Sequence, residues 1–159
     1  MEHKFPTIAN VCYIINEKNE VLLQYKTRGV GKGKWVGPGG KIDEGETVEQ
    51  SVKREVFEET NLILEDPELM AEIEFVFSGK EDWNLLCYAF VVHKFHNEIV
   101  ANDEGELRWF KVFELPYLEM WEDDQYWLAR AFLGEKMKMR FFYNKETLRI
   151  EKFEYLGKI

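Results

Sequence analysis

The sequence is poor in cysteine and in positive charge, and each shortage argues against a class of protein. Only Cys12 and Cys87 are present, both inside apolar stretches and without a CxxC pair. We therefore expect buried free thiols in a reducing compartment and no zinc site. Lys and Arg number 21 against 30 Asp and Glu, a net charge of −9. This balance disfavours nonspecific binding to nucleic acid or to an anionic membrane.

Targeting segments, linkers and long apolar runs are lacking as well. The stretch 1–6 has no hydrophobic region of a signal peptide, and no apolar run is long enough to span a bilayer. No Ser/Pro-rich stretch, low-complexity block or repeat interrupts the chain. We expect one domain over residues 1–159, in the cytoplasm, as a monomer or small homo-oligomer without membrane or nucleic-acid partners.

Short apolar runs bounded by turn residues predict strands. They lie at 8–15, 21–25, 69–77, 85–92, 107–113, 137–143 and 148–155. Helices are predicted from Glu46 or Thr47 to about Thr60, and from Asp123 or Asp124 to about Leu133. The stretch 26–45 holds seven of the eleven glycines, which predicts a long shaped loop. Strands interleaved with helices predict an α/β (α+β) fold with a mixed sheet between helices.

Carboxylates are plentiful, and three of them share a helical spacing after a glycine turn. Glu55, Glu58 and Glu59 stand at i, i+3 and i+4 and project from one side of a helix. Like charges so placed repel each other, and a bound cation makes such a cluster easier to tolerate. Hard oxygen ligands suit Mg²⁺ or Mn²⁺, which in turn suit phosphate chemistry. The alternative is an ordinary solvated acidic helix.

The segment from the glycine turn through this helix resembles the Nudix box, G-x5-E-x7-R-E-U-x-E-E-x-G-U, in which U is aliphatic. The matching positions are Gly40, Glu46, Arg54, Glu55, Val56, Glu58, Glu59 and Leu62. Asn61 stands where the family has glycine. Asparagine is the non-glycine residue that best tolerates positive φ, so a left-handed helix end is retained. The resemblance implies the Nudix α/β/α sandwich with a central mixed sheet.

The resemblance also implies a metal site for hydrolysis of a phosphoanhydride. It assigns metal binding to Glu55, Glu58 and Glu59, and we favour Glu55 as acceptor of the water proton. The Gly39 or Gly40 carbonyl can add a ligand, because glycine lets the backbone come close. The catalytic set is completed by Arg54.

Three further charged residues are assigned around this site. Arg54 is expected to pair with a box carboxylate and to fix its rotamer. Glu46 either positions residues that contact the metal, without contacting it itself, or is only a favourable negative charge at the start of the helix. Glu104, in the loop 102–106 before a strand, is expected to be a further metal ligand, because Nudix enzymes often supply one from such a loop. The alternative for Glu104 is a solvated loop carboxylate.

The glycine-rich loop contains lysines that could meet phosphate. Lys26 leaves a strand that points at the box, and we favour it as a phosphate ligand. Lys32 and Lys34 are interpreted as solvated lysines of a mobile surface loop.

The stretch 120–127, Met-Trp-Glu-Asp-Asp-Gln-Tyr-Trp, resembles the M-W-x-D-D-x-Y-W segment of one branch of the family, the MutT homologues that hydrolyse oxidised purine nucleoside triphosphates. The similarity extends from about Asn10 to Tyr155. Trp121 can stack on a purine. Asp123 and Asp124 can share a proton, so that one accepts and one donates to the base edge. The alternative is a helix N-cap followed by a first-turn carboxylate.

The same resemblance assigns the remaining substrate contacts. They are Asn10, Lys26, Val36, Gly39, Lys41 and Phe75. Val36 stands where the branch carries a base-contacting asparagine, and valine cannot make that hydrogen bond. Val30 replaces an aromatic residue near the pocket. The loss of one buried polar contact shifts discrimination by about 1–3 kcal/mol, enough to re-rank the candidate purines.

The resemblance implies hydrolysis of oxidised purine nucleoside triphosphates such as 8-oxo-dGTP to the monophosphate and pyrophosphate. The reaction is expected to depend on Mg²⁺, with Mn²⁺ as the alternative ion. This reaction sanitises the nucleotide pool and serves DNA repair, with a small nucleotide as substrate. One alternative is a Nudix hydrolase for a nucleotide sugar, an ordinary nucleotide or a capped RNA end. Another is a non-catalytic Nudix-fold sensor, which would not need all three glutamates.

Overall fold

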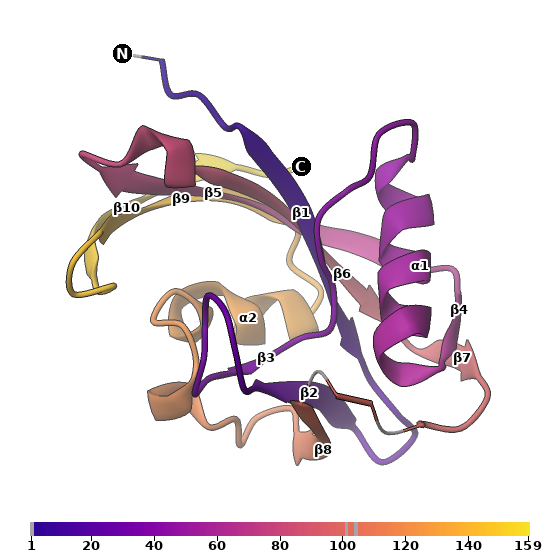
Figure 1. Ribbon diagram of the computed structural model, residues 1–159. Helices are drawn as coiled ribbons and strands as arrows, with labels where there is room; N and C mark the ends of the chain where they lie inside the picture. The colour runs from indigo at the N-terminus through magenta and orange to yellow at the C-terminus, as the bar shows by residue number, and fades with distance from the viewer. Residues whose placement is uncertain (1, 101, 104) are drawn as a thin grey trace.

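A mixed five-stranded sheet forms the centre of the fold (Figure 1). The computed structural model describes residues 2–100, 102–103 and 105–159. In spatial order the strands are β1 (Thr7–Ile14), β6 (Leu85–Val92), β5 (Glu68–Ser78), β9 (Met137–Asn144) and β10 (Ile150–Gly157). β1 pairs with β6, and β5 with β9, in parallel; β5–β6 and β9–β10 are antiparallel.

Two smaller sheets and two short 3-10 turns complete the strand regions. β2 (Glu20–Lys26) lies between β3 (Trp35–Val36) and β8 (Gly105–Lys111), and β4 (Ile63–Glu65) pairs with β7 (Lys94–His96). The turns are η1 (Glu81–Trp83) and η2 (Tyr117–Glu119). The sequence did not predict β3, β4 or β7, because strands of two or three residues are too short to show a period of two.

The first helix, α1 (Val48–Thr60), is defined by its caps. The Thr47 hydroxyl accepts a hydrogen bond from the Gln50 N–H, and the Gln50 side chain accepts one from the Thr47 N–H, which is a capping box. At the other end Asn61 has φ 72° and ψ 2°, so asparagine takes the left-handed conformation that the sequence predicts. The helix therefore begins one or two residues after the predicted start.

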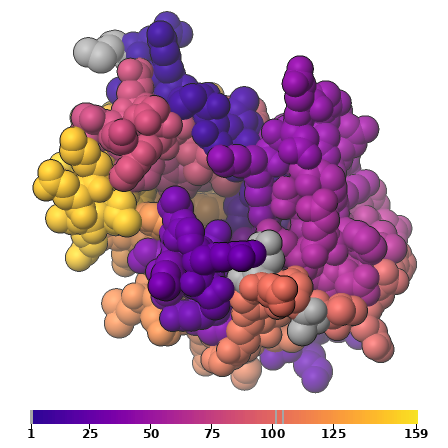
Figure 2. All heavy atoms as spheres, viewed as in Figure 1, coloured from indigo at the N-terminus to yellow at the C-terminus, as the bar shows by residue number. Residues whose placement is uncertain are grey.

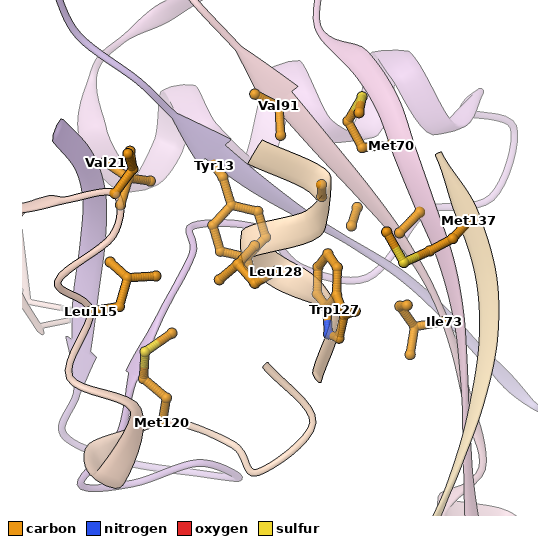
Figure 3. Close-up of a cluster of buried hydrophobic side chains, with 14 of the residues drawn as sticks. Tyr13, Val21, Met70, Ile73, Val91, Leu115, Met120, Trp127, Leu128 and Met137 are labelled. Carbon is orange, nitrogen blue, oxygen red and sulfur yellow. The ribbon is translucent and has the colours of Figure 1, made fainter. Parts of the chain in front are cut away.

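The central strands are buried on both faces, and alternate residues along a strand belong to two separate hydrophobic cores. On β1, Cys12 and Ile14 pack with Val52 of α1, whereas Tyr13 packs with Trp127 of α2 (Asp124–Phe132). Figure 3 shows the second cluster, in which Tyr13 and Trp127 lie together. α1 and α2 thus lie on opposite sides of β1 and β6 (Figure 1). The predicted fold class, helices around a central mixed sheet, is confirmed.

Cys12 and Cys87 are free and buried, as predicted, and burial raises the pKa of each thiol. Within the described part of the chain, no helix is both long enough and apolar enough to cross a membrane.

Candidate active site

Two carboxylates of α1, those of Glu55 and Glu59, lie against the glycine turn at 39–40. Glu59 is buried, with 8% of its surface exposed, and accepts a hydrogen bond of 3.2 Å from the Gly39 N–H. The Glu55 side chain is mostly covered, whereas that of Glu58 is 56% exposed. The three glutamates therefore differ in environment although they share one side of the helix.

Arg54 ties the charged residues of this region together. Its guanidinium lies 2.7 Å from Glu46, 2.9 Å from Glu55, and 3.2 Å from both Glu58 and Asp43. The expected pairing of Arg54 with a box carboxylate is thus present, with several carboxylates at once. Hydrogen bonds from Arg54 and from the Asp43 N–H lower the pKa of Glu46 to about 2. Glu46 therefore helps to position the Arg54 guanidinium through this ion pair.

Glu55 is held directly under Gly40. A β-carbon at Gly40 would lie 2.6 Å from the Glu55 carboxyl carbon and 2.7 Å from Oε2, so a larger residue would displace the carboxylate. Burial raises the pKa of Glu55, and the charges of Glu58 and Asp43 raise it further, while Arg54 opposes the shift. A carboxylate with a raised pKa is a better proton acceptor than an ordinary one.

The glycine turn passes unusually close to β1. A β-carbon at Gly39 would lie 2.2 Å from the Asn10 carbonyl oxygen, so this position requires glycine. The Gly40 carbonyl accepts a hydrogen bond of 2.9 Å from the Asn10 N–H. A metal bound at the Gly40 carbonyl would therefore share that oxygen with β1.

The box residues fit a hard divalent cation by type and by location. The three carboxylates lie on one side of α1, and burial together with the charges of Glu58 and Asp43 raises the pKa of Glu55, a cost that a bound cation would offset. Within 2–100, 102–103 and 105–159, no three acidic, His or Cys side chains already converge as a metal site. Arg54 holds Glu55 and Glu58, and Gly39 holds Glu59. Glu104, the predicted further ligand, lies outside the described residues.

A cavity of about 810 Å³ opens beside the box. Figure 2 shows a hollow near the middle of this face, beside the dark purple glycine loop. Its wall comes from residues far apart in the sequence: Ala9, Val11 and Tyr13 of β1, Ile73, Phe75 and Phe77 of β5, Tyr143 of β9, and Trp121, Asp123, Asp124 and Trp127 around the start of α2. Gly40 and Lys41 also line the cavity, so it is continuous with the box.

Most of the predicted substrate contacts reach this cavity. The lining includes Val36, Lys41, Phe75 and Trp121, as well as the aspartate pair. Gly39 lies in the adjacent turn. Lys26 is not in the lining but lies behind the glycine loop, since a β-carbon on Gly31 would be 3.5 Å from the Lys26 Cδ.

Asn10 is the predicted contact that the structure places elsewhere. Its amide nitrogen donates to the Ser51 Oγ at 2.8 Å, and its amide oxygen accepts from the Gly40 N–H at 3.4 Å. Side chains alternate along a strand, so Ala9 and Val11 face the cavity while Asn10 faces α1. Asn10 therefore supports the glycine turn and makes no contact with the cavity.

Asp123 and Asp124 are both buried, with 2% and 6% of their surface exposed. The Tyr143 hydroxyl donates to the Asp123 Oδ1 at 2.6 Å, and the Trp127 Nε1 donates to Oδ2 at 2.8 Å. Asp123 stands at the N-cap position of α2 and Asp124 in its first turn, as in the alternative interpretation, but the Asp123 side chain makes no capping hydrogen bond to α2.

Burial dominates the electrostatics of the pair. It raises the pKa of Asp123, and the hydrogen bonds from Tyr143 and Trp127 oppose that shift. Burial also raises the pKa of Asp124, and the charge of Asp123 raises it further, while Lys34 opposes the shift. Ionisation of Asp123 therefore disfavours ionisation of Asp124.

Lys34 requires a correction. Its Nζ lies 5.2 Å from the centroid of the Trp121 ring, and the residue lines the cavity, so it is not simply a solvated loop lysine. Lys32 lines the cavity too.

Sequence reasoning also missed Tyr143, which is fully buried. The available signal was its place at the end of an aromatic strand, but a strand pattern does not reveal which buried ring carries a hydroxyl at a site.

The chain matches the NUDIX domain family over residues 4–131. It is 32% identical over 136 residues to the oxidized purine nucleoside triphosphate hydrolase of Mus musculus, covering 85% of this chain and 86% of that protein. The Danio rerio protein of the same description is 35% identical over 126 residues, with 76% and 80% coverage. A MutT protein of Bacillus halodurans has a crystal structure similar to this one, with a TM-score of 0.82, 28% identity and coverage of 94% and 97%. The chain therefore belongs to the Nudix family of hydrolases.

Proposed function

We propose that this protein hydrolyses oxidised purine nucleoside triphosphates such as 8-oxo-dGTP to the monophosphate and pyrophosphate, and so sanitises the nucleotide pool. The observation that carries this proposal is the cavity beside the box, which joins an aromatic wall to a buried aspartate pair. A purine requires an aromatic wall for its faces and polar groups for its edge. The descriptions of the mouse and zebrafish relatives support the same substrate class.

The box would hold the triphosphate end of the substrate. Glu55, Glu58 and Glu59 would hold divalent cations, Mg²⁺ or Mn²⁺, and Glu104 is proposed to join them. Such a cation neutralises phosphate oxygens and makes bound water more acidic. Glu55 would accept the proton of the attacking water, because its carboxylate lies directly under Gly40, at the centre of the box.

The remaining residues of the box position these groups. Arg54 holds Glu55 and Glu58 in place through its guanidinium. Gly40 leaves the space that the Glu55 carboxylate occupies. Lys41, exposed at the cavity edge, and Lys26, behind the glycine loop, supply positive charge for phosphate oxygens on an otherwise acidic protein.

The cavity would hold the base. Trp121 stacks on the purine, Phe75 forms a second aromatic surface, and Asp123 and Asp124 read the polar edge. Val36 contributes only apolar surface, so the pocket differs in that contact from one with asparagine at this position.

The test is a turnover screen of the purified protein in Mg²⁺, with and without a chelator. The substrates are 8-oxo-dGTP, 2-hydroxy-dATP, dGTP, dATP, dTTP and ADP-ribose, and pyrophosphate release and monophosphate formation are measured. We expect an oxidised purine triphosphate to give the highest kcat/KM and the chelator to abolish turnover. Preference for ADP-ribose or dTTP would overturn the substrate assignment in favour of another Nudix activity.

A further inference from the structure

We propose that Tyr143 is a positioning residue that fixes the roles of the two aspartates: Asp123 is the ionised acceptor and Asp124 is the carboxylic acid that donates to the base edge. This inference rests on the proposed function for its substrate, but the arrangement of the proton is a property of the protein alone. It makes the hydroxyl of Tyr143 a determinant of specificity although it acts through Asp123.

The direction of the Tyr143 hydroxyl is set by the backbone. The Asp123 N–H donates to the Tyr143 Oη at 3.0 Å, and the same oxygen lies 2.6 Å from the Asp123 Oδ1. A hydroxyl that accepts an N–H must direct its own proton elsewhere, and Oδ1 is the acceptor in reach. The ring is held by Phe75, Phe77 and Trp121, with centroids 5.7–6.0 Å away.

Both oxygens of Asp123 are therefore occupied by donors. The Trp127 indole can only donate, and it lies 2.8 Å from Oδ2. A proton on Asp123 would have to share an oxygen with one of these two donors. Hydrogen bonds to a charged carboxylate stabilise the charged form, so Asp123 remains ionised.

Asp124 is then the member of the pair that keeps the proton. It is buried like its neighbour, and the negative charge of Asp123 lies beside it. Two carboxylates at close range do not both ionise. Asp124 also lines the cavity, which places this residue where a base would bind.

Other titratable groups, from several elements of the fold, lie close enough to the pair to interact with it. Tyr13 of β1, Cys87 of β6 and Tyr117 of η2 interact with it electrostatically, and burial raises the pKa of each. They are therefore neutral at physiological pH. Lys34 supplies a positive charge near Asp124. One ionised aspartate beside one lysine is a balanced arrangement, whereas two ionised aspartates are not.

A pocket in which the proton is fixed on Asp124 accepts fewer bases than a pocket in which the proton can move between the two aspartates. The donor is fixed at Asp124, so a base must present an acceptor there. A base that presents a donor to Asp124 leaves a buried polar group without a hydrogen-bond partner. The cost of such an unpaired group gives a binding site its strongest discrimination.

The direct test is a carbon NMR titration of the aspartate carboxyl groups in the ligand-free protein. The variants are Asp123→Asn, Asp124→Asn and Tyr143→Phe, with Tyr155→Phe as the matched control, because it removes a tyrosine hydroxyl from an exposed strand position. We expect the carboxyl signal that stays protonated to the highest pH to vanish in Asp124→Asn. In Tyr143→Phe the titration of Asp123 should move up by about one to two pH units.

The inference is overturned if the high-pH signal survives in Asp124→Asn and vanishes in Asp123→Asn, or if Tyr143→Phe titrates like the Tyr155→Phe control. An enzymatic test follows with kcat/KM on 8-oxo-dGTP and dGTP across pH. Tyr143→Phe should lower the ratio of the two values about tenfold and move its acid limb to higher pH, and an unchanged ratio and limb would contradict the inference. If the wild type hydrolyses no purine triphosphate, the proposed function fails while the NMR result still decides the proton arrangement.

Discussion

The Nudix box and the neighbouring cavity are built in opposite ways. The box takes its charged groups from one turn and one helix and ties most of them together through Arg54. The cavity takes its wall from several distant parts of the chain and includes two buried aspartates. A local cluster suits a reaction common to a whole family, whereas a pocket built from dispersed residues can change its substrate through single side chains.

The largest effect is expected at the box. Glu55→Gln preserves the shape of the side chain but removes the charge that accepts a proton, so kcat should fall by about 10²- to 10⁴-fold. The matched control is Glu49→Gln, which lies on the same helix and pairs only at the surface with Lys53. Base preference should be unchanged in both variants. Equal turnover of Glu55→Gln and the control in saturating Mg²⁺ would refute the role of Glu55.

A slightly smaller effect should follow from Gly40→Ala. The added β-carbon would meet the Glu55 carboxylate, the movable end of a flexible side chain, so the chain should fold while the carboxylate moves. A displacement of this size can cost about 10²-fold in rate. In the double variant with Glu55→Gln the two losses should not add. Additive losses in steady-state kinetics would show that Gly40 acts on something other than Glu55.

In the cavity, a change in stability is expected from Asp124→Asn. The pKa of Asp124 is higher in the folded chain than in the unfolded one, so the folded state binds the proton more tightly. The free energy of unfolding therefore falls as pH rises above about 3.9, the ordinary aspartate pKa. Asparagine does not titrate, so the variant should melt higher than the wild type at about pH 7.5, by at least about 2–4 °C, the shift that corresponds to 1 kcal/mol.

The melting difference should shrink towards about pH 4. Asp66→Asn, at an exposed position, serves as the control and should show no such trend. If thermal melts of Asp124→Asn run parallel to the wild type at every pH, Asp124 does not keep a proton in the folded state.

The smallest effect is expected from Lys34→Met. The positive charge of Lys34 lowers the pKa of Asp124, so its removal should let Asp124 keep the proton to higher pH. The preference for an oxidised purine should then persist further into the alkaline range, by up to about one pH unit. Lys53→Met, on the exposed face of α1, is the control. If the variant loses its preference for the oxidised purine, measured as the ratio of the two kcat/KM values, at a lower pH than the wild type, this arrangement is contradicted.

The two regions also differ in how far the sequence could predict them. The spacing of Glu55, Glu58 and Glu59 lies within one helix, and helical geometry alone places them on one side. The cavity depends on strand register and on which face of a strand is buried. Asn10 shows the difficulty, because a shift of one residue along β1 exchanges the cavity side for the α1 side.

Lys34 and Tyr143 illustrate the same limit. Nothing local in a glycine-rich loop indicates that Lys34 folds back over Trp121. The hydrogen bond between Tyr143 and Asp123 joins residues of β9 and the start of α2 that are 20 positions apart. Contacts of this kind depend on tertiary packing, which short-range patterns do not encode.

The central claim, that the box performs the chemistry and the aspartate pair selects the base, is tested most directly by one ratio. It is kcat/KM for 8-oxo-dGTP divided by kcat/KM for dGTP, in the wild type and in Asp124→Asn at a single saturating Mg²⁺ concentration. We predict that the wild type favours the oxidised substrate, and that the variant loses about 10- to 100-fold of this ratio while it still hydrolyses dGTP. Equal slowing of both substrates, with the ratio unchanged, would contradict the claim.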